Sequence, residues 1–370
     1  MTMLILAVAL TSWICVPAQG QVLEHDRYIK YIPEGAYTLL SFRHQEAIKK
    51  TTIYREHTEF FAGKVSNHDL PFPDADVLRS YKIIIYNVRR LQTEVAKAER
   101  TGEIYINPPG IEEYAWIYDI SGLRLHIEEA LKAGAVSDTG VKVGKLPICS
   151  FSRDGQTQRE HLYLCESEPD VLLVCGEIEL LKSMVLSGLG LQKSLDYTDE
   201  YYSVLDLVGD HIDWSVQLIS TMRQSNIDAR ERRGATNAQL AYMRESASRK
   251  YQMIVRYTIF EDERLIYRTE YIFTDEDAAE EYYPRMSMRI APPAVYTKIA
   301  AEDEIEEPQE VKTFFAGTIT SSKTTLEGNK VVRNRIIDRD YINEYLRIHR
   351  QYKDYFEAQS RNRYRSTVDQ

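Results

Sequence analysis

Two histidine-containing stretches hold the residue types that could carry out chemistry. In residues 209–214 (GDHIDW), His211 stands two positions before Asp213. A histidine beside a carboxylate is the arrangement of a general base with the group that orients it, and this pair is a candidate for the catalytic site of a hydrolase of an extracellular polymer. A turn histidine with ordinary hydrogen bonds is the simpler interpretation. His57 with His68 is the second candidate pair for a hydrolase.

The same region offers a candidate metal site. His57 and Glu59 precede His68 and Asp69 across a loop that contains proline. Imidazole and carboxylate groups are common ligands of zinc. However, His57 and Glu59 are two positions apart in an expected helix, so their side chains point in different directions. We therefore expect no metal and no cofactor, and the sequence has no phosphate-binding loop, dinucleotide-binding glycine motif or nucleophile elbow.

Tyrosine is unusually frequent, with 26 copies against 10 of phenylalanine. Its ring is amphipathic, which suits half-exposed sheet faces and interfaces. A helix is expected from about Asp340, and Tyr345, Tyr352 and Tyr355 mark one side of it. These three residues are a candidate binding surface for a protein, peptide or glycan, with the alternative that the helix docks on its own chain.

The bulk composition describes a globular protein. The chain has 370 residues, of which 44% are hydrophobic and 28% are charged, so it can bury a large core. Its formal net charge is -10, and a protein this acidic has no general attraction to nucleic acid.

The N-terminal residues predict export. Residues 4–16 are an apolar run, but a bilayer needs about 20 such residues. Small residues at Ala18 and Gly20 fit a signal-peptidase site, so we expect a signal peptide over residues 1–20 and a secreted or periplasmic mature chain. No later segment is apolar enough for a transmembrane span.

Three cysteines remain after the expected cleavage, namely Cys149, Cys165 and Cys175. In an oxidising compartment one pair could form a disulfide. Cys149 and Cys165 lie on adjacent expected strands and are the first candidates. The alternative is three buried free thiols.

Residues 253–283 show most clearly how the chain is built. Apolar and polar residues alternate on both sides of a polar turn at 261–264, which is typical of a hairpin with one solvated face. Arg256, Arg268 and Glu270 are expected on that face. Thr274 would begin the next helix and Pro284 would end it.

The same reasoning predicts the other elements. Strands are expected over 36–42, 103–106, 114–120, 146–151, 161–165, 171–175, 215–220, 313–321 and 330–337. Helices are expected over 44–61, 76–100, 122–133, 177–186, 196–208, 237–247 and from 340, and residues 223–236 as a loop. Within 76–100, the run Ile83-Ile84-Ile85 favours a strand as the alternative. The fold class is therefore α+β, with antiparallel sheets, helices packed on one face and repeated strand–strand–helix units that would be consistent with a duplication.

The expected organisation has three parts after the signal peptide. They are an α+β lobe over 21–190, a second lobe over 191–300, and an acidic linker, hairpin and helix over 301–370. The leading functional hypothesis is a non-enzymatic binding or scaffold protein outside the cytoplasm. One alternative is an extracytoplasmic hydrolase, and the other is a carrier of an apolar ligand, which would require an apolar cavity of ligand size.

Overall fold

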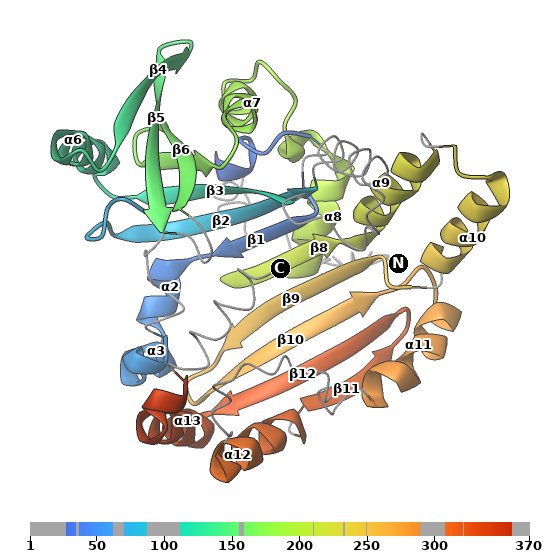
Figure 1. The fold of residues 1–370 in the computed structure, drawn as a ribbon. Coiled ribbons are helices and arrows are strands. Elements are labelled where there is room, and N and C mark those ends of the chain that lie inside the picture. The colour runs from blue at the N-terminus through green and yellow to red at the C-terminus, as the bar shows by residue number, and fades with distance from the viewer. Residues whose placement is uncertain are drawn as a thin grey trace, which may run out of the picture.

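The computed structural model describes residues 27–34, 37–61, 70–86, 112–154, 159–209, 211–231, 234–248, 250–288, 308–320 and 322–356. Within these ranges every named strand belongs to one sheet of 12 strands, in the order β11-β12-β10-β9-β8-β1-β2-β3-β7-β6-β5-β4 (Figure 1). All neighbouring pairs are antiparallel, which confirms the predicted α+β class. The expected signal peptide lies outside the described residues.

Runs of strands and runs of helices follow one another along the chain. The strands are β1 (Leu39–Arg43), β2 (Val77–Tyr86), β3 (Glu112–Ile120), β4 (Ser137–Val143), β5 (Leu146–Asp154), β6 (Arg159–Glu168), β7 (Val171–Cys175), β8 (Asp213–Leu218), β9 (Met253–Phe260), β10 (Arg264–Ile272), β11 (Ser322–Glu327) and β12 (Lys330–Asp338). The α-helices are α2 (Gln45–Lys50), α3 (Thr52–Glu56), α4 (Thr58–Phe61), α6 (Leu123–Ala133), α7 (Ile178–Gly188), α8 (Asp199–Val208), α9 (Ile219–Glu231), α10 (Asn237–Ser248), α11 (Glu276–Met288), α12 (Gln309–Thr320) and α13 (Arg339–Gln351). No helix in the described ranges is long and apolar enough to cross a membrane.

The strand order repeats a pattern. In each half three strands form a meander (β1–β2–β3 and β8–β9–β10), a helix follows (α6 and α11), and a later strand (β7 and β12) returns to pair with the third. The first strands of the halves, β1 and β8, pair antiparallel at the centre of the sheet. This arrangement is consistent with the expected duplication.

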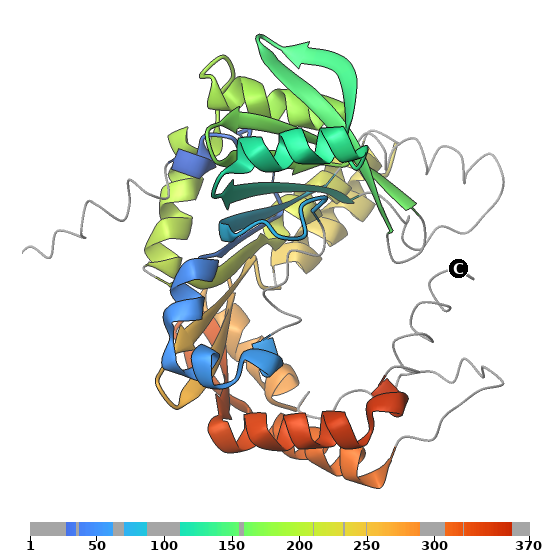
Figure 2. The same ribbon diagram turned by 90° about the vertical axis from the view of Figure 1, so that its left-hand side faces the viewer.

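Helices cover the two halves of the sheet differently. In the first half, α7, α8 and residues 27–32 pack on one face, and α6 packs on the other. In the second half, α3, α4, α11 and α13 all pack on one face of β10 and β12. Figure 2 shows α12 and α13 at one end of a curved molecule, opposite α6 and α7. Packing on one face therefore describes β10 and β12, while the first half is covered on both sides and α8 also packs on β8 and β9.

The helix predicted over 76–100 is wrong where it can be checked. Residues 77–86 form β2, which pairs with β1 and β3 near the middle of the sheet. Val77, Tyr81 and Ile83 are buried. A central strand with both faces covered does not alternate strictly, so its apolar residues imitated helical spacing. Residues 87–111, including the strand expected at 103–106, lie outside the described residues.

The strand predicted over 313–321 is also wrong, because this segment forms most of α12. Val311 is buried and the ring of Phe314 stacks on that of Tyr341, with centroids 5.0 Å apart. Val311, Phe314 and Phe315 follow the spacing of one helix face. The strand that was expected here, β11, begins only at Ser322.

The hairpin over residues 253–272 is confirmed, but the details around it differ. Asp275 caps α11, because its carboxylate accepts a hydrogen bond from the backbone nitrogen of Ala278 at 2.8 Å. The helix continues through Pro284 to Met288. Proline removes one helix hydrogen bond without always ending the helix.

Two elements were not predicted at all. The first is β4, a polar edge strand with the sequence SDTGVKV. Edge strands are commonly polar, and this removes the apolar alternation by which a strand is recognised. The second is α9, which occupies part of the expected loop at 223–236 and has a mostly polar sequence.

Candidate functional site

A pocket of about 640 Å³ lies between the second half of the sheet and the helices that cover it. Its size is within the range of small-molecule binding sites. The floor is formed by β10 and β12. The walls come from α4, α12 and α13, with contributions from α2, β1, β8 and β9.

The pairing of β10 with β12 brings the floor residues together. Tyr267 is paired with Arg335, Thr269 with Arg333, and Ile337 completes the row on β12. Because side chains alternate along a strand, these five residues project from the same face. All five line the pocket.

Aromatic rings form the helical walls. The rings of Phe60 on α4 and Tyr345 on α13 meet edge to face, with centroids 5.4 Å apart and an interplanar angle of 88°. Phe61, Tyr341 and Phe315 add further rings to the lining. Edge-to-face and offset contacts are the favourable geometries for such pairs. The pocket therefore offers a continuous aromatic surface.

One charged pair lies at the side of the pocket formed by β1 and β8. Arg43 donates from Nε to Oδ1 of Asp213 at 3.1 Å. The hydroxyl of Thr258 donates to Oδ2 of the same carboxylate at 3.1 Å. This carboxylate is therefore already engaged by protein groups.

Two further guanidinium groups have no such counter-charge. Arg333 donates to the backbone oxygen of Met286 at 2.9 Å, and Arg335 donates to the hydroxyl of Tyr341 at 3.1 Å. The Nε atoms of both arginines are buried and have no hydrogen-bond partner. Neither forms an ion pair with any carboxylate in the described part of the chain. With Arg43 neutralised by Asp213, the pocket carries an excess of two positive charges.

The phenol groups of Tyr267 and Tyr345 in the pocket are neutral at physiological pH. Burial, together with the charge of Asp213, raises the pKa of Tyr267 to about 12. Burial also raises the pKa of Tyr345. Both shifts follow from the removal of water around the phenol, which disfavours its charged form. The floor and wall of the pocket can therefore donate phenolic hydrogen bonds.

Ion pairs on the surface attach α13 to the helices beside it. Arg339 pairs with Glu56 of α3 at 2.7 Å, and Arg350 pairs with Glu59 of α4. On the other side, Arg347 pairs with Glu310 of α12. These contacts hold the walls of the pocket against one another.

Comparison with known proteins gives only distant matches. No protein-family model matches the chain, and no curated protein sequence matches it. Among solved structures, crystal form I of TP0453 aligns with a TM-score of 0.40 and 7% identity over 86% of this chain and 96% of that chain. Crystal form IV of TP0453 has a TM-score of 0.40, 8% identity and coverage of 86% and 95%, and form III has 0.39, 10%, 84% and 93%. This likeness carries no argument about fold or function.

The three tyrosines predicted as a binding surface have different environments. Tyr345 lines the pocket. The hydroxyl of Tyr352 instead donates to Oε2 of Glu310 at 2.8 Å, which ties α13 to α12. The ring of Tyr355 packs on Phe356 with centroids 5.4 Å apart. One of the three thus lies at the pocket, and a second supports its wall.

The structure does not assemble the His211–Asp213 pair. The imidazole of His211 stacks on the ring of Tyr257, with centroids 3.9 Å apart. Tyr257 and Thr258 are neighbours on β9 and project from opposite faces, and Thr258 is the residue that binds Asp213. The predicted dyad is therefore split across the sheet, which corrects the prediction.

The candidate metal ligands can be checked only in part. Nε2 of His57 is buried and has no hydrogen-bond partner, whereas Glu59 is paired with Arg350. His68 and Asp69 lie outside the described residues. Within the described ranges no three His, Cys, Asp or Glu residues gather in a way that could hold a metal ion.

The predicted disulfide is not formed. Cys149, Cys165 and Cys175 are all buried free thiols. Cys149 lies opposite Leu164 in the β5–β6 pair, so Cys165, one position on, projects from the other face. Burial raises the pKa of Cys165 and of Cys175 to about 12, which keeps both as unreactive thiols at neutral pH.

The prediction that Arg256, Arg268 and Glu270 share a solvated face is also corrected. Arg256 is paired with Thr269 and lies on the pocket face, because the register of the hairpin places it there. Arg268 and Glu270 lie on the opposite face. There Glu270 is buried and accepts hydrogen bonds from Arg268 at 2.8 Å and from Tyr257 at 3.0 Å.

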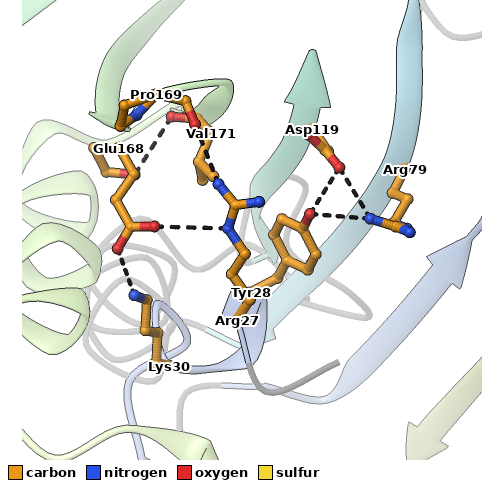
Figure 3. Close-up of polar contacts among 9 residues, drawn as sticks. Arg27, Tyr28, Lys30, Arg79, Asp119, Glu168, Pro169 and Val171 are labelled. Carbon is orange, nitrogen blue, oxygen red and sulfur yellow. Dashed lines mark hydrogen bonds and ion pairs between the residues drawn. The ribbon is translucent and has the colours of Figure 1, made fainter. Parts of the chain in front are cut away.

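A second polar cluster lies at the start of the described chain (Figure 3). The hydroxyl of Tyr28 donates to Asp119 at 2.7 Å, and Arg79 binds both groups at 3.3 and 3.2 Å. Lys30 pairs with Glu168 at 2.5 Å. The buried groups of this cluster satisfy one another, so we interpret it as the anchor of residues 27–32 rather than a binding site.

The charged residues of the pocket were missed in the sequence. Arg333 and Arg335 share their parity on β12 with Val331 and Ile337, both of which are buried. Two arginines on the apolar side of an alternating strand were the available signal, because buried charges need a special partner. Their position beside α4 depends on contacts between distant segments, which the alternation alone does not reveal.

Proposed function

We propose that the protein is a non-enzymatic binding protein that acts outside the cytoplasm and holds its ligand in the pocket between β10, β12 and the helices α4, α12 and α13. One observation carries this proposal. Arg333 and Arg335 bring two guanidinium groups, neither of which has an ion-pair partner in the described part of the chain, to a pocket whose walls are aromatic. A positive charge in such a place is costly unless a ligand supplies the counter-charge. The location outside the cytoplasm is supported by residues 4–20 of the sequence.

Among the earlier hypotheses, the binding protein and the ligand carrier converge on this site. Tyr345 belongs to the expected tyrosine surface and lines the pocket. The hydrolase is disfavoured because Asp213 is engaged by Arg43 and Thr258, and because His211 lies on the other face. A role for His57 with His68 stays a prediction.

Native mass spectrometry of the full chain, purified from the extracytoplasmic fraction of producing cells, tests the proposal. The wild type is expected to carry a small-molecule adduct. Thr269→Trp places an indole on the pocket floor and should remove that adduct. Ile336→Trp is the matched control, since Ile336 is on the same sheet but 43% exposed and on the opposite face.

An adduct that persists in Thr269→Trp would place the ligand elsewhere and contradict the proposed site. A wild-type chain with no adduct in any preparation would contradict the proposed function itself. Circular dichroism of each variant establishes that the added ring leaves the fold intact.

A further inference from the structure

We infer that the ligand is an amphiphilic acid, whose anionic head group lies between Arg333 and Arg335 and whose apolar body lies along Ile337 and the rings of α4 and α13. This inference rests on the proposed function and adds the chemical class of the ligand. It is based on the order of side chains along β12, where two cationic residues are followed by an aliphatic residue that adjoins the aromatic rings.

The cationic end can receive one acid group. Arg333 and Arg335 are two positions apart on the same face of β12, so their α-carbons are separated by about 7 Å. Each guanidinium has five N–H donors, of which one nitrogen in each is used by a protein acceptor. Arginine binds carboxylate or phosphate through two parallel hydrogen bonds. A single anionic group between the two arginines would satisfy both.

The neighbouring strand adds to the positive charge of this end. Arg256 is paired across the sheet with Thr269, which is itself paired with Arg333. The side chain of Arg256 has no ion pair or hydrogen bond to any residue in the described ranges. In a protein with a net charge of -10, this local excess of cations selects for an anion.

The apolar end continues from the same strand. Ile337 is two positions beyond Arg335, and it joins Phe60 and Phe61 of α4 in one hydrophobic cluster. From Arg333 to Ile337 the strand spans about 14 Å, which is comparable with the length of a medium-chain alkyl group. The edge-to-face contact of Phe60 with Tyr345 closes this end.

The pocket offers a sugar few strong acceptors, because it is lined by a single carboxylate. Sugar recognition needs many donors and acceptors, but the carboxylate of Asp213 is already bound by Arg43 and Thr258. Besides the guanidinium and phenol groups, the lining offers the hydroxyls of Thr269 and Ser322. An acid with an apolar body uses the cations and the rings together.

Titration calorimetry with three probes tests this inference on the full chain. Monomeric laurate has both the acid and the chain, dodecanol has the chain alone, and acetate has the acid alone. We expect laurate to bind at least 10-fold more tightly than dodecanol and acetate to show no measurable binding. Loss of a hydrogen bond to a charged group corresponds to roughly a 10- to 100-fold change in affinity.

Arg333→Gln and Arg335→Gln should each weaken laurate binding by about 10- to 100-fold and leave dodecanol binding unchanged. Lys323→Gln is the control, because Lys323 is exposed on β11 and its removal changes the net charge equally. It should alter laurate binding less than about 2-fold, since exposed charges far from a ligand are screened by salt.

The outcomes separate the ligand class from the proposed function. Laurate and dodecanol could bind equally well, with binding unaffected by the arginine variants but lost in Thr269→Trp. That result would contradict an acidic head group and leave the pocket as a binding site. Binding of acetate as tight as that of laurate would overturn the apolar body. The wild type could carry an adduct that is lost in Thr269→Trp and yet bind none of the three probes. That result would overturn this inference and leave the proposed function standing.

Discussion

At the scale of single residues, the most constrained contact is between Gly188 and Tyr31. A β-carbon built on Gly188 would lie 2.1 Å from a ring carbon of Tyr31. The ring of Tyr31 is buried, as are Val185 and Ser187 in the last turn of α7, so the ring cannot move without disturbing the core. The glycine is needed here for close approach, and its backbone needs no unusual conformation.

We predict that Gly188→Ala destabilises the fold by about 1–3 kcal/mol, the usual cost of overpacking a core. Urea unfolding at neutral pH measures the change in the free energy of unfolding. Gly176→Ala is the control, because its added carbon would lie 3.9 Å from Leu162, which is an ordinary contact. Equal stability of the two variants would contradict the close packing of Tyr31.

A second prediction at this scale concerns the carboxyl group of Glu270. Burial alone would raise the pKa of this carboxyl, but hydrogen bonds from Arg268, Lys330 and Tyr257 lower it overall. A carboxyl whose pKa is lower in the folded state stabilises the fold above its unfolded pKa, and this stabilisation is lost as the pH falls through the folded pKa. Glu270→Gln should therefore cost about 1–3 kcal/mol at pH 7.

Urea unfolding of the wild type and of Glu270→Gln over a range of pH checks this prediction. The difference in the free energy of unfolding should shrink as the pH is lowered below the ordinary glutamate range. Glu327→Gln is a useful comparison, because Glu327 also pairs with Arg268 but its side chain is 45% exposed. A difference that stays constant between pH 7 and acid pH would contradict the account of Glu270.

At the scale of elements, the sequence predicted those segments whose pattern is local. The expected positions are found for the β9–β10 hairpin, for α6 and for the strands β5, β6 and β7. In each of these elements the alternation or helical spacing reflects one buried face. The prediction from sequence failed for β2 and α12. Both bury apolar side chains against distant segments, and tertiary packing of that kind overrides the local pattern.

The attachment of α12 to α13 can be tested directly. The carboxylate of Glu310 accepts hydrogen bonds from Arg347, Gln351 and Tyr352, and these contacts lower its pKa. Glu310→Gln should increase the rate of amide hydrogen exchange in residues 309–320, because α12 loses its charged contacts with α13. Hydrogen exchange with mass spectrometry measures this rate.

Glu344→Gln is the matched control for that experiment. Glu344 pairs with Arg347 within α13, so its loss removes a contact of the same arginine without touching α12. High salt should reduce the difference between wild type and Glu310→Gln, because these pairs are exposed and screened. If both variants left the exchange of α12 unchanged, the ion pairs would not hold this wall.

At the scale of the whole molecule, one sheet joins the two halves. β1 and β8 pair at its centre, and Phe42 of β1 packs on Trp214 of β8 with ring centroids 5.7 Å apart. The same hydrophobic cluster includes Tyr81 of the first half and Val255 of the second. The halves therefore share a core and should unfold together.

Trp214→Ala should destabilise both halves by about 3–5 kcal/mol, the typical cost of removing a large buried ring. Hydrogen exchange under mild urea should show loss of protection in both halves at the same denaturant concentration. Tyr242→Ala is the control, since Tyr242 is 73% exposed, and it should change stability by less than about 0.5 kcal/mol. Unfolding of one half while the other stays protected would contradict a shared core.

The pocket also belongs to this scale, which explains how little of it was predicted. Tyr345 was expected as a binding residue, whereas Arg333 and Arg335 were not. Their pocket is completed by α4, which lies more than 200 residues before β12 in the chain, together with α12 and α13. The sequence indicates an alternating strand with two arginines. Only the assembled fold surrounds them with aromatic rings.

A crystal structure of the full chain with 12-bromododecanoic acid would test the pocket most directly. The account predicts a carboxylate within hydrogen-bonding distance of Arg333 and Arg335, and an anomalous bromine signal among the rings of α4 and α13. A bromine signal on another face of the sheet, with the pocket unoccupied, would contradict it.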